Sequence, residues 1–303
     1  MNQMDGIRDV LTQKFGSRVL FDCDGAQLTT MRTGGKIFAL VDVQNEDEIE
    51  FLFGMKQNGI AVRFLGCGSN VLLGDRGFKG IICISRGFAT INADGAKIST
   101  GSGLLLKKFL AFSIRHGLKG AEFLAGVPGT IGGALMLNAG TKTEYISQLL
   151  SSVKFLDQSG SWQEKESSSI PWGYRDSGLR NEAFFIAKAS FVLHPSSSIE
   201  VRKTIQQYMQ MRKLTQPWDL PSAGSVFKNP PGMFAGKLIE EAGLKGFAIG
   251  GARISEKHAN FIVNTGGATA QDVRFLMEHV QKVVMAKYNI MLEPEIELIG
   301  DCL

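Results

Sequence analysis

The 303-residue sequence predicts an α+β fold in two parts. Short apolar stretches typical of strands dominate the region before residue 195, with only a few helical patterns among them. The stretch PSSSIE (195–200) then interrupts the regular patterns, as linkers rich in proline and serine do. Beyond it, helical and strand patterns share a shorter segment. We therefore expect a larger strand-rich part followed by a smaller α+β part.

The first regular unit is expected between residues 37 and 66. IFALVDV (37–43) predicts a strand, and NEDEIEFLFGMKQNG (45–59) predicts a helix that an Asn cap begins and Gly59 ends. IAVRFLG (60–66) predicts the next strand. These three segments form a β-α-β unit.

The next segments are mostly strands. The sequence predicts them, in order, at NVLL (70–73), GIICIS (80–85), INADGAKISTGS (91–102, with an Asp-Gly hairpin turn), VKFLDQSGSWQE (153–164, strand-turn-strand) and AFFIAKASFVLH (183–194, ended by His194-Pro195). One amphipathic helix, LLLKKFLAFSIRHG, is expected among them and ends at Gly117. Strands therefore form most of this part.

The part after residue 195 contains more helix. Helices are expected at VRKTIQQYMQMRKLT (201–215), AGKLIEEAG (235–243) and TAQDVRFLMEHVQKVVMAKYN (269–289), and strands at NFIVN (260–264) and IMLEPEIELIG (290–300). The loop QPWDLPSAGSVFKNPPG (216–232), bounded by prolines, follows the first of these helices. A second domain is therefore expected here.

Composition sets limits on the class of protein. The hydrophobic content of 44% fits a soluble globular chain, and the net charge of +4 is too small to argue for nucleic-acid binding. No run approaches eighteen apolar residues and the start lacks a leader pattern, so we expect a cytoplasmic protein without membrane insertion. The four cysteines, at 23, 67, 83 and 302, lack metal or redox spacing, so they are expected to be buried or free thiols. The histidines show no ligand spacing, and no metal is expected.

Two glycine-dense loops are the main candidates for a binding site. The first is GCGSN (66–70), and the second lies in GVPGTIGGALMLNAG (126–140). The first is not a dinucleotide fingerprint, because Val71 holds the third glycine position, and neither loop has the Lys and Ser or Thr of a P-loop. An anion-binding nest of main-chain amides and a tight turn between strands both remain possible for the first loop. Together, the two loops favour a large nucleotide as ligand.

Six blocks, in order, resemble one known family. They are GCGSNVLL, GVPGTIGGALMLNAG, GYRDSGL (173–179), AGSVFKNP (223–230), ISEKHANFIVN (254–264) and LEPEIELIG (292–300). Together they are similar to the UDP-N-acetylenolpyruvoylglucosamine reductases, bacterial FAD enzymes that make UDP-N-acetylmuramate for peptidoglycan. The short spacing between the third and fourth blocks resembles the compact type, which lacks an extra substrate-covering loop.

The resemblance implies an FAD-binding fold of the p-cresol methylhydroxylase type. Its two subdomains would be residues 1–66 and 67–195, and residues 196–303 would form a smaller α+β substrate-binding domain with a C-terminal catalytic strand. FAD would be bound non-covalently. The residues expected to bind it are Gly66, Cys67, Gly68, Ser69 and Asn70 at the diphosphate, and Val127, Pro128, Gly129, Thr130, Ile131, Gly132 and Gly133 along the cofactor.

The resemblance also implies a reaction. Hydride would pass from NADPH, as co-substrate, to the flavin, and then to the enolpyruvyl group of UDP-N-acetylglucosamine enolpyruvate. The product would be UDP-N-acetylmuramate, used in cell-wall biogenesis and hence in cell shape and division. A monomer is expected, and neither nucleic acid nor membrane is expected as a partner.

Three residues in the blocks suit this chemistry. Hydride addition leaves negative charge beside the substrate carboxylate, so the reaction needs a positive group and a proton. Arg175 could hold the carboxylate, Ser225 could supply the proton, and Glu295 could share a hydrogen bond with the enediol. From the residues alone, each has an ordinary alternative: a surface-turn arginine, a capping or turn serine, and a solvent-facing strand glutamate.

Four further residues are expected at the substrate. Lys228 and Asn229 match family positions that contact it, Arg212 could meet its diphosphate, and Tyr174 could line the flavin or substrate face. Arg212 could equally be a solvated helix charge, and Tyr174 a half-buried aromatic.

The terminal strand departs from the family pattern at one position. Glu297 stands where the family usually has Arg, and on a regular strand it would share a face with Glu295 at roughly 7 Å. The sequence does not tell what this extra negative charge does.

Two other classes of protein remain open. One is an alcohol or sugar oxidase on the same flavin fold with covalently attached FAD, for which only Cys67 in the glycine loops could serve. The other is a nucleotide-sugar binding protein that has lost catalysis, which the presence of Arg175, Ser225 and Glu295 disfavours.

Overall fold

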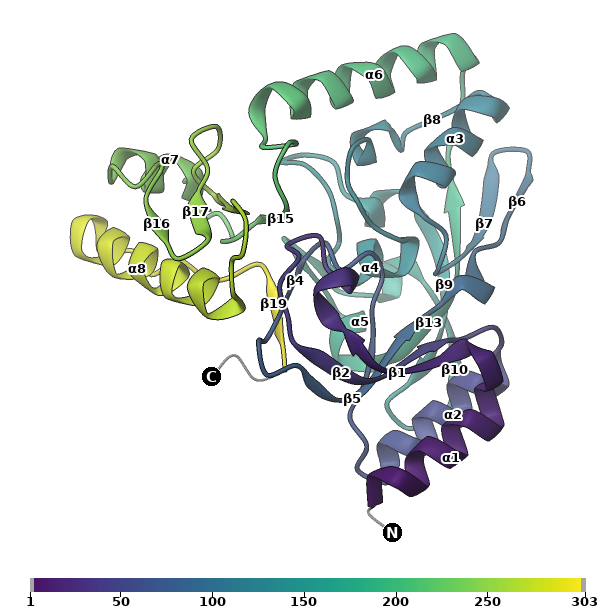
Figure 1. Ribbon diagram of the computed structural model, residues 1–303. Helices are drawn as coiled ribbons and strands as arrows, with labels where there is room; N and C mark the ends of the chain where they lie inside the picture. Colours follow the sequence, from purple (N-terminus) through teal and green to yellow (C-terminus); the bar gives the residue numbers. More distant parts are fainter. Residues whose placement is uncertain (1–2, 301–303) are drawn as a thin grey trace. The chain divides into compact units, whose positions relative to one another are not determined.

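The computed structural model describes residues 3–300 of the chain. Within this range, Figure 1 labels the elements along the chain. The helices are α1 (Gln3–Phe15), α2 (Glu46–Gln57), α3 (Leu106–His116), α4 (Ile131–Met136), α5 (Leu179–Glu182), α6 (Ser198–Thr215), α7 (Ala235–Glu241) and α8 (Ala270–Tyr288).

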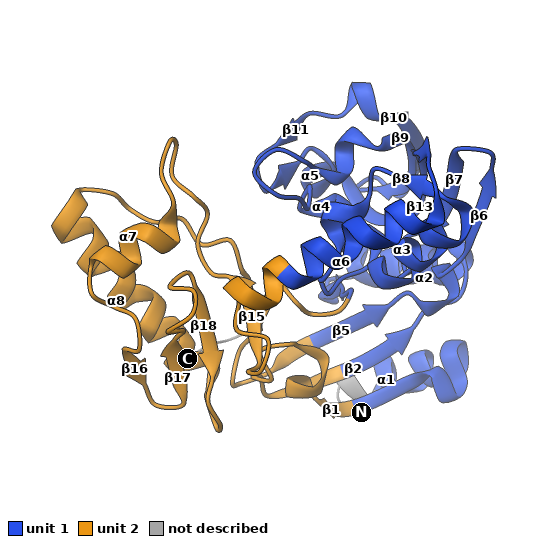
Figure 2. Cartoon of the chain, turned by 90° about the horizontal axis from the view of Figure 1, so that it is seen from above, with its two compact units in different colours: residues 1–21, 39–66, 80–210 blue, residues 22–38, 67–79, 211–303 orange. Residues whose placement is uncertain are grey.

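The chain packs into two compact units, coloured separately in Figure 2. Unit 1 comprises residues 1–21, 39–66 and 80–210, and unit 2 comprises residues 22–38, 67–79 and 211–303. Each unit is thus assembled from three separate chain segments. The domain boundaries predicted from the sequence, after residues 66 and 195, divide the chain into consecutive stretches. They stay a prediction.

Unit 1 contains a five-stranded sheet in the order β10-β9-β13-β7-β6. Its strands are β6 (Ile91–Asp94), β7 (Lys97–Gly101), β9 (Leu150–Asp157), β10 (Trp162–Glu166) and β13 (Ala183–Val192). All neighbours are antiparallel, and the predicted Asp-Gly hairpin is confirmed by the pairing of Asp94 with Lys97. Helix α3 buries Phe109 and Leu110 in the same core as the sheet residue Phe155 and ends at Gly117, as predicted.

A second sheet has the order β1-β2-β5-β3. Its strands are β1 (Val19–Asp24), β2 (Lys36–Asp42), β3 (Val62–Phe64) and β5 (Phe78–Ile84), and the boundary between the units passes within β1, β2 and β5. The predicted β-α-β unit is confirmed as β2, α2 and β3. Helix α2 begins as expected, because the Asn45 side chain accepts a hydrogen bond from the Glu48 N–H at 3.0 Å.

A partly buried ion pair fixes the first turn of α2 in unit 1. The Glu48 carboxylate accepts from Arg18 at 2.5 and 2.9 Å and from the Gln44 N–H at 2.8 Å, and the residue is 5% exposed. Burial alone would raise the pKa of Glu48, but the hydrogen bonds from Arg18 and Gln44 lower it overall. The carboxylate therefore stabilises the folded state when it is charged.

We expect Glu48→Gln to lower the free energy of unfolding by about 2 kcal/mol at neutral pH, because charged hydrogen bonds to Arg18 are lost. Since the pKa is lowered on folding, the difference should be largest above the ordinary Glu pKa and should shrink as pH falls through the lowered value. Urea unfolding at several pH values measures this. Asp47→Asn, an exposed change on the same helix, is the control; an equal loss in both variants would contradict the prediction.

Unit 2 contains a four-stranded antiparallel sheet in the order β15-β18-β17-β16. Its strands are β15 (Ser222–Ser225), β16 (Ala248–Ile249), β17 (Ala252–Ile254) and β18 (Phe261–Asn264). Helices α7 and α8 contribute Leu238, Leu276 and Val280 to one core with the sheet residue Ile262. The unit also contains the parallel pair β4 (Val71–Leu73) and β19 (Glu297–Ile299).

Shorter pairs complete the part of the chain that is described. They are β8 (Leu118–Lys119) with β14 (His194–Pro195), and β11 (Trp172–Gly173) with β12 (Asp176–Ser177). The sequence patterns did not predict α1 or the short helix α4, which continues the second glycine loop. Helix α6 also begins at Ser198, inside the stretch expected to be a linker.

The prediction of one strand over residues 290–300 is wrong. The chain bends at Ile296, and only β19 (Glu297–Ile299) is a regular strand. The physical reason is a change of partner: the Glu295 N–H donates to the Val226 carbonyl at 2.8 Å, whereas the Glu297 N–H donates to the Asn70 carbonyl at 2.9 Å. The rule that placed Glu295 and Glu297 on one face of a strand therefore does not apply.

The cysteine prediction is confirmed for the three residues that the structure describes. Among the described residues, Cys23, Cys67 and Cys83 take part in no disulfide, and Cys302 lies outside the described residues. Burial raises the pKa of Cys83. Over residues 3–300, no helix is long and apolar enough to span a membrane, and no group of three His, Cys, Asp or Glu side chains could hold a metal ion.

Candidate nucleotide and catalytic site

The first glycine loop makes a tight turn that only a glycine allows at position 68. Gly68 has a φ of +60°, and a Cβ there would lie 2.0 Å from the Leu28 carbonyl oxygen. Its own carbonyl accepts from the Thr30 N–H at 3.1 Å. The main-chain N–H groups of Gly68 and Asn70 donate to no carbonyl of the described backbone. A turn with such available amides fits the diphosphate of a nucleotide.

The second glycine loop lies along residues 102–106 of unit 1, the turn that leads into α3. Leu106 donates to the Gly129 carbonyl, and Ile131 and Gly132 donate to the carbonyls of Leu104 and Ser102, at 2.8 to 2.9 Å. Thr130 then caps α4, accepting from the Gly133 N–H at 3.3 Å. These bonds fix the main chain of the expected cofactor-binding residues 127–133.

Gly66, the first residue of the first glycine loop, meets the second loop within unit 1. A Cβ on Gly66 would lie 2.7 Å from the Thr130 hydroxyl oxygen, so the absence of a side chain at Gly66 permits this approach. Gly66 itself is exposed. Within unit 1, the structure therefore places Gly66 beside Thr130, although the two residues lie far apart in the sequence.

In unit 2, the first glycine loop also lies beside the strand that ends at Ser225. Thr30 makes this connection, because its N–H donates to the Gly68 carbonyl and its hydroxyl donates to the Ser222 carbonyl at 2.7 Å. A register shift in β15 separates Ser222 from Ser225, and Gly224 within it has a φ of +76°. Such a bulge redirects the next side chain. Ser225 is half-buried at this position.

Glu295 is joined to both of these segments through its main chain. Its N–H donates to the Val226 carbonyl at 2.8 Å, and its carbonyl accepts from the Asn70 side chain at 2.9 Å. Ser225 and Glu295 are therefore neighbours in unit 2, together with residues 67–70 of the first glycine loop. The side-chain amide of Asn70, expected at the cofactor, is engaged with Glu295.

The predicted substrate ligands of unit 2 also have contacts within the protein. Lys228 forms an ion pair with Glu293 at 2.6 Å, and the Asn229 side chain accepts from the Ala235 N–H at the start of α7. Arg212 is half-buried near the end of α6. Lys228 keeps 24% of its side chain exposed, so it remains accessible to an anion.

Arg175 and Tyr174 form the turn of the β11–β12 hairpin in unit 1. Arg175 has a φ of +54°, which is unusual for a residue with a side chain and marks a candidate functional position. Its guanidinium donates to the Gly140 carbonyl at 3.1 Å and lies 5.4 Å from the Tyr174 ring. Asn138 also donates to the Gly173 carbonyl. The hairpin is thus attached to the end of the second glycine block.

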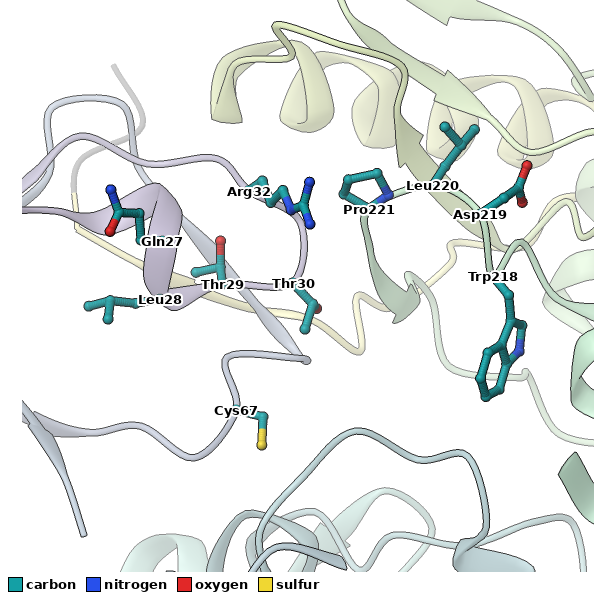
Figure 3. A pocket seen from close by; sticks show the side chains of 10 residues that line it. All are labelled: Gln27, Leu28, Thr29, Thr30, Arg32, Cys67, Trp218, Asp219, Leu220 and Pro221. Carbon is teal, nitrogen blue, oxygen red and sulfur yellow. The ribbon is translucent and has the colours of Figure 1, made fainter. Parts of the chain in front are cut away.

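A cavity of about 450 Å³ lies within unit 2 (Figure 3). Its walls come from the segment before β2, the first glycine loop and the loop before β15. The lining residues are Gln27, Leu28, Thr29, Thr30, Arg32, Cys67, Trp218, Asp219, Leu220 and Pro221. An exposed indole, a guanidinium and several hydroxyls are groups that can bind an aromatic ring and a phosphate.

Sequence reasoning missed Thr30, Arg32 and Trp218. Thr30 lies 192 residues before Ser222 and belongs to no motif that was recognised, so no local pattern indicated its role. Trp218 lies within the proline-bounded loop 216–232, before the AGSVFKNP block. An aromatic residue in such a loop was the only available signal.

Family models match most of the chain. Residues 39–165 match the FAD binding domain, and residues 216–299 match the UDP-N-acetylenolpyruvoylglucosamine reductase C-terminal domain. The second match covers β15, Ser225 and Glu295, and the first covers both glycine loops.

Relatives match over nearly the full length. The UDP-N-acetylenolpyruvoylglucosamine reductase of Carboxydothermus hydrogenoformans is 37% identical over 297 residues, covering 97% of this chain and 98% of the relative. That of Caldicellulosiruptor saccharolyticus is 40% identical over 292 residues, covering 95% and 94%. The crystal structure of the Thermus caldophilus enzyme superposes with a TM-score of 0.79 at 33% identity, covering 93% and 98%.

The fold and the glycine loops define an FAD-dependent oxidoreductase, which confirms the predicted cofactor and the predicted α+β fold with an FAD-binding domain. Among such enzymes, the chain belongs to the UDP-N-acetylenolpyruvoylglucosamine reductase family.

Proposed function

We propose that this chain reduces the enolpyruvyl group of UDP-N-acetylglucosamine enolpyruvate to give UDP-N-acetylmuramate, with NADPH as hydride donor. One observation in particular supports this beside the family match. In unit 2, Thr30 connects the first glycine loop to β15, the strand that ends at Ser225, and Asn70 connects the same loop to Glu295 in the segment before β19. The turn expected to bind the cofactor is therefore bonded to the two segments whose residues Ser225 and Glu295 bear a hydroxyl and a carboxyl group, the groups that the second half of the reaction needs.

The residues present fit FAD. The available amides of Gly68 and Asn70 suit its diphosphate, and the cavity lined by Trp218 and Arg32 suits part of a nucleotide. When bound, FAD accepts hydride from NADPH and delivers it to the substrate double bond. The chain's own residues bind both molecules and handle the charge and the proton.

Ser225 is proposed as the proton donor. Hydride addition leaves a carbanion next to the substrate carboxylate, and this strong base can take a proton from a serine hydroxyl. The bulge at Gly224 sets the direction of the Ser225 side chain. Hydroxyl groups are weak acids, so the alkoxide that forms needs a nearby positive group, for which Lys228 is the candidate in unit 2, whereas Glu295 is proposed to share a hydrogen bond with the enediol.

Arg175 is proposed to hold the substrate carboxylate and to stabilise the enediolate that develops there. A guanidinium stays charged and can bind a carboxylate through two hydrogen bonds. The left-handed conformation of Arg175 supports a functional role, since this conformation costs an ordinary residue about 1 kcal/mol or more. Tyr174, Arg212 and Asn229 stay predicted substrate contacts, and a monomeric state and cytoplasmic location stay predictions.

The purified protein is expected to be yellow and to release its flavin on acid or heat denaturation. NADPH should bleach it without oxygen, and the enolpyruvyl substrate should restore the colour, whereas UDP-N-acetylglucosamine should not. Absorbance at the flavin band measures all three steps. Flavin that stays on denatured, washed protein would favour a covalent oxidase, with Cys67 as the attachment point. Bleaching by NADPH without reoxidation by the substrate would refute the proposed reaction.

A further inference from the structure

Asn70 makes hydrogen bonds that a cofactor ligand alone does not need. Its side-chain nitrogen donates to the Glu295 carbonyl at 2.9 Å, and its main-chain carbonyl accepts from the Glu297 N–H at 2.9 Å. The two partners lie on either side of Ile296, where the chain bends. A single residue of the first glycine loop therefore holds both ends of this bend.

The main-chain N–H of Glu295 is held by Val226, the residue that follows Ser225. The Glu295 N–H donates to the Val226 carbonyl, so both the N–H and the carbonyl of Glu295 are engaged. Fixing these two groups fixes the direction in which the Glu295 side chain leaves the main chain. The Val226 bond belongs to the backbone and survives most substitutions, whereas the Asn70 bond depends on one side chain.

We propose that Asn70 is a positioning residue for Glu295: its side-chain amide sets the direction of the carboxylate for the half-reaction with the enolpyruvyl substrate. This inference rests on the proposed function, in which Glu295 acts in that half-reaction. Two features of the amide support this inference. It is the side-chain donor to the Glu295 carbonyl, and its residue is continuous with the turn that is expected to bind the cofactor diphosphate.

The chemistry distinguishes this role from that of a simple cofactor ligand. Loss of a ligand of the FAD diphosphate would lower the affinity for the cofactor, and both half-reactions would then be slower when FAD is limiting. A residue that acts through Glu295 would affect only the step that uses Glu295, because hydride transfer from NADPH needs no carboxylate there. Misplacing a catalytic group by about 1 Å can cost on the order of 100-fold in rate.

The test uses Asn70→Ala, Asn70→Asp, Glu295→Gln and the double variant Asn70→Ala with Glu295→Gln. Asn70→Asp keeps the shape of the side chain but replaces the N–H donor with an acceptor that faces the Glu295 carbonyl. Each holoenzyme is saturated with FAD and followed by stopped-flow absorbance, first during bleaching by NADPH and then during reoxidation by the substrate. Asn58→Ala is the control, because it removes a similar 2.9 Å bond from a side-chain amide to a carbonyl, in α2.

We expect both Asn70 variants to slow reoxidation by 10- to 100-fold while bleaching and the FAD dissociation constant change by less than about threefold. In the Glu295→Gln background, Asn70→Ala should slow reoxidation by less than about a further twofold. The reason is that the effects of substituting two residues are not additive when one residue acts through the other. The inference is overturned if the two substitutions multiply, if Asn70→Asp behaves as wild type, or if FAD affinity falls in proportion to the rate. A Glu295→Gln variant that reoxidises normally would instead refute the proposed role of Glu295.

Discussion

Replacing Ser225 by alanine is expected to abolish most of the substrate half-reaction and to spare the NADPH half-reaction. Bleaching by NADPH needs no proton from this hydroxyl, whereas the carbanion left after hydride transfer to the substrate must be protonated. We expect reoxidation by the enolpyruvyl substrate to slow at least ~100-fold, the typical effect of losing one general acid. Stopped-flow absorbance at equal FAD occupancy measures the two steps separately.

Ser222→Ala is the matched control for this prediction, because Ser222 begins the same strand and contributes its main-chain carbonyl, rather than its hydroxyl, to Thr30. Ser225→Cys should recover part of the rate, since a thiol can also donate a proton. A serine with only a structural role would give a different result: a stability loss on the order of 1 kcal/mol and small, equal effects on both rates. That result would remove Ser225 from the mechanism.

Replacing Gly68 by alanine is expected to weaken FAD binding strongly. The new Cβ would lie 2.0 Å from the Leu28 carbonyl oxygen, and the φ of +60° would be strained as well, so the turn must change its conformation. The amides of Gly68 and Asn70 would then leave the positions in which we propose that they bind the diphosphate. We expect at least tenfold weaker FAD binding, equal to about 1.4 kcal/mol, measured by flavin fluorescence titration.

Gly59→Ala separates the clash from the conformational strain. Gly59 also has a positive φ, +84°, but nothing lies within 4 Å of a Cβ there. This control should therefore lose only about 1 kcal/mol of stability and keep its affinity for FAD. Thermal unfolding of both variants should show a further loss of about 1–3 kcal/mol for Gly68→Ala, as expected for an overpacked site. Equal FAD affinity in the two variants would contradict the proposed role of the first glycine loop.

Local patterns in the sequence determined most of the regular elements. Periodicity predicted α2, α3, α7 and α8. End signals also marked the limits of α2 and α3, because a cap or a left-handed terminal residue acts within one turn of the helix that it ends. The hairpin at Asp94-Gly95 followed from the same kind of local rule. The six blocks also determined the family, since their combination in order is far more specific than any single loop.

The last strand shows where local reasoning stopped. LEPEIEL has the alternation of a strand, yet the chain bends at Ile296, because Glu295 and Glu297 bond to different partner segments. Alternation indicates which side chains can face a core, but it does not indicate how many neighbouring segments the backbone will hydrogen-bond to. Only the tertiary structure revealed that the carboxylate and the next acid do not share a regular strand.

The sequence by itself thus determined the family, the cofactor class and the residues Arg175, Ser225 and Glu295 as candidates. The tertiary structure decided what holds Glu295 in place and what is bonded to the strand that ends at Ser225. Thr30 reaches Ser222 across 192 residues, and Asn70 reaches Glu295 across 225. The physical reason is that each bond joins a side chain to a main-chain carbonyl. A carbonyl is present at every residue, so nothing in the acceptor's identity marks it in the sequence, and only the folded backbone brings it within reach.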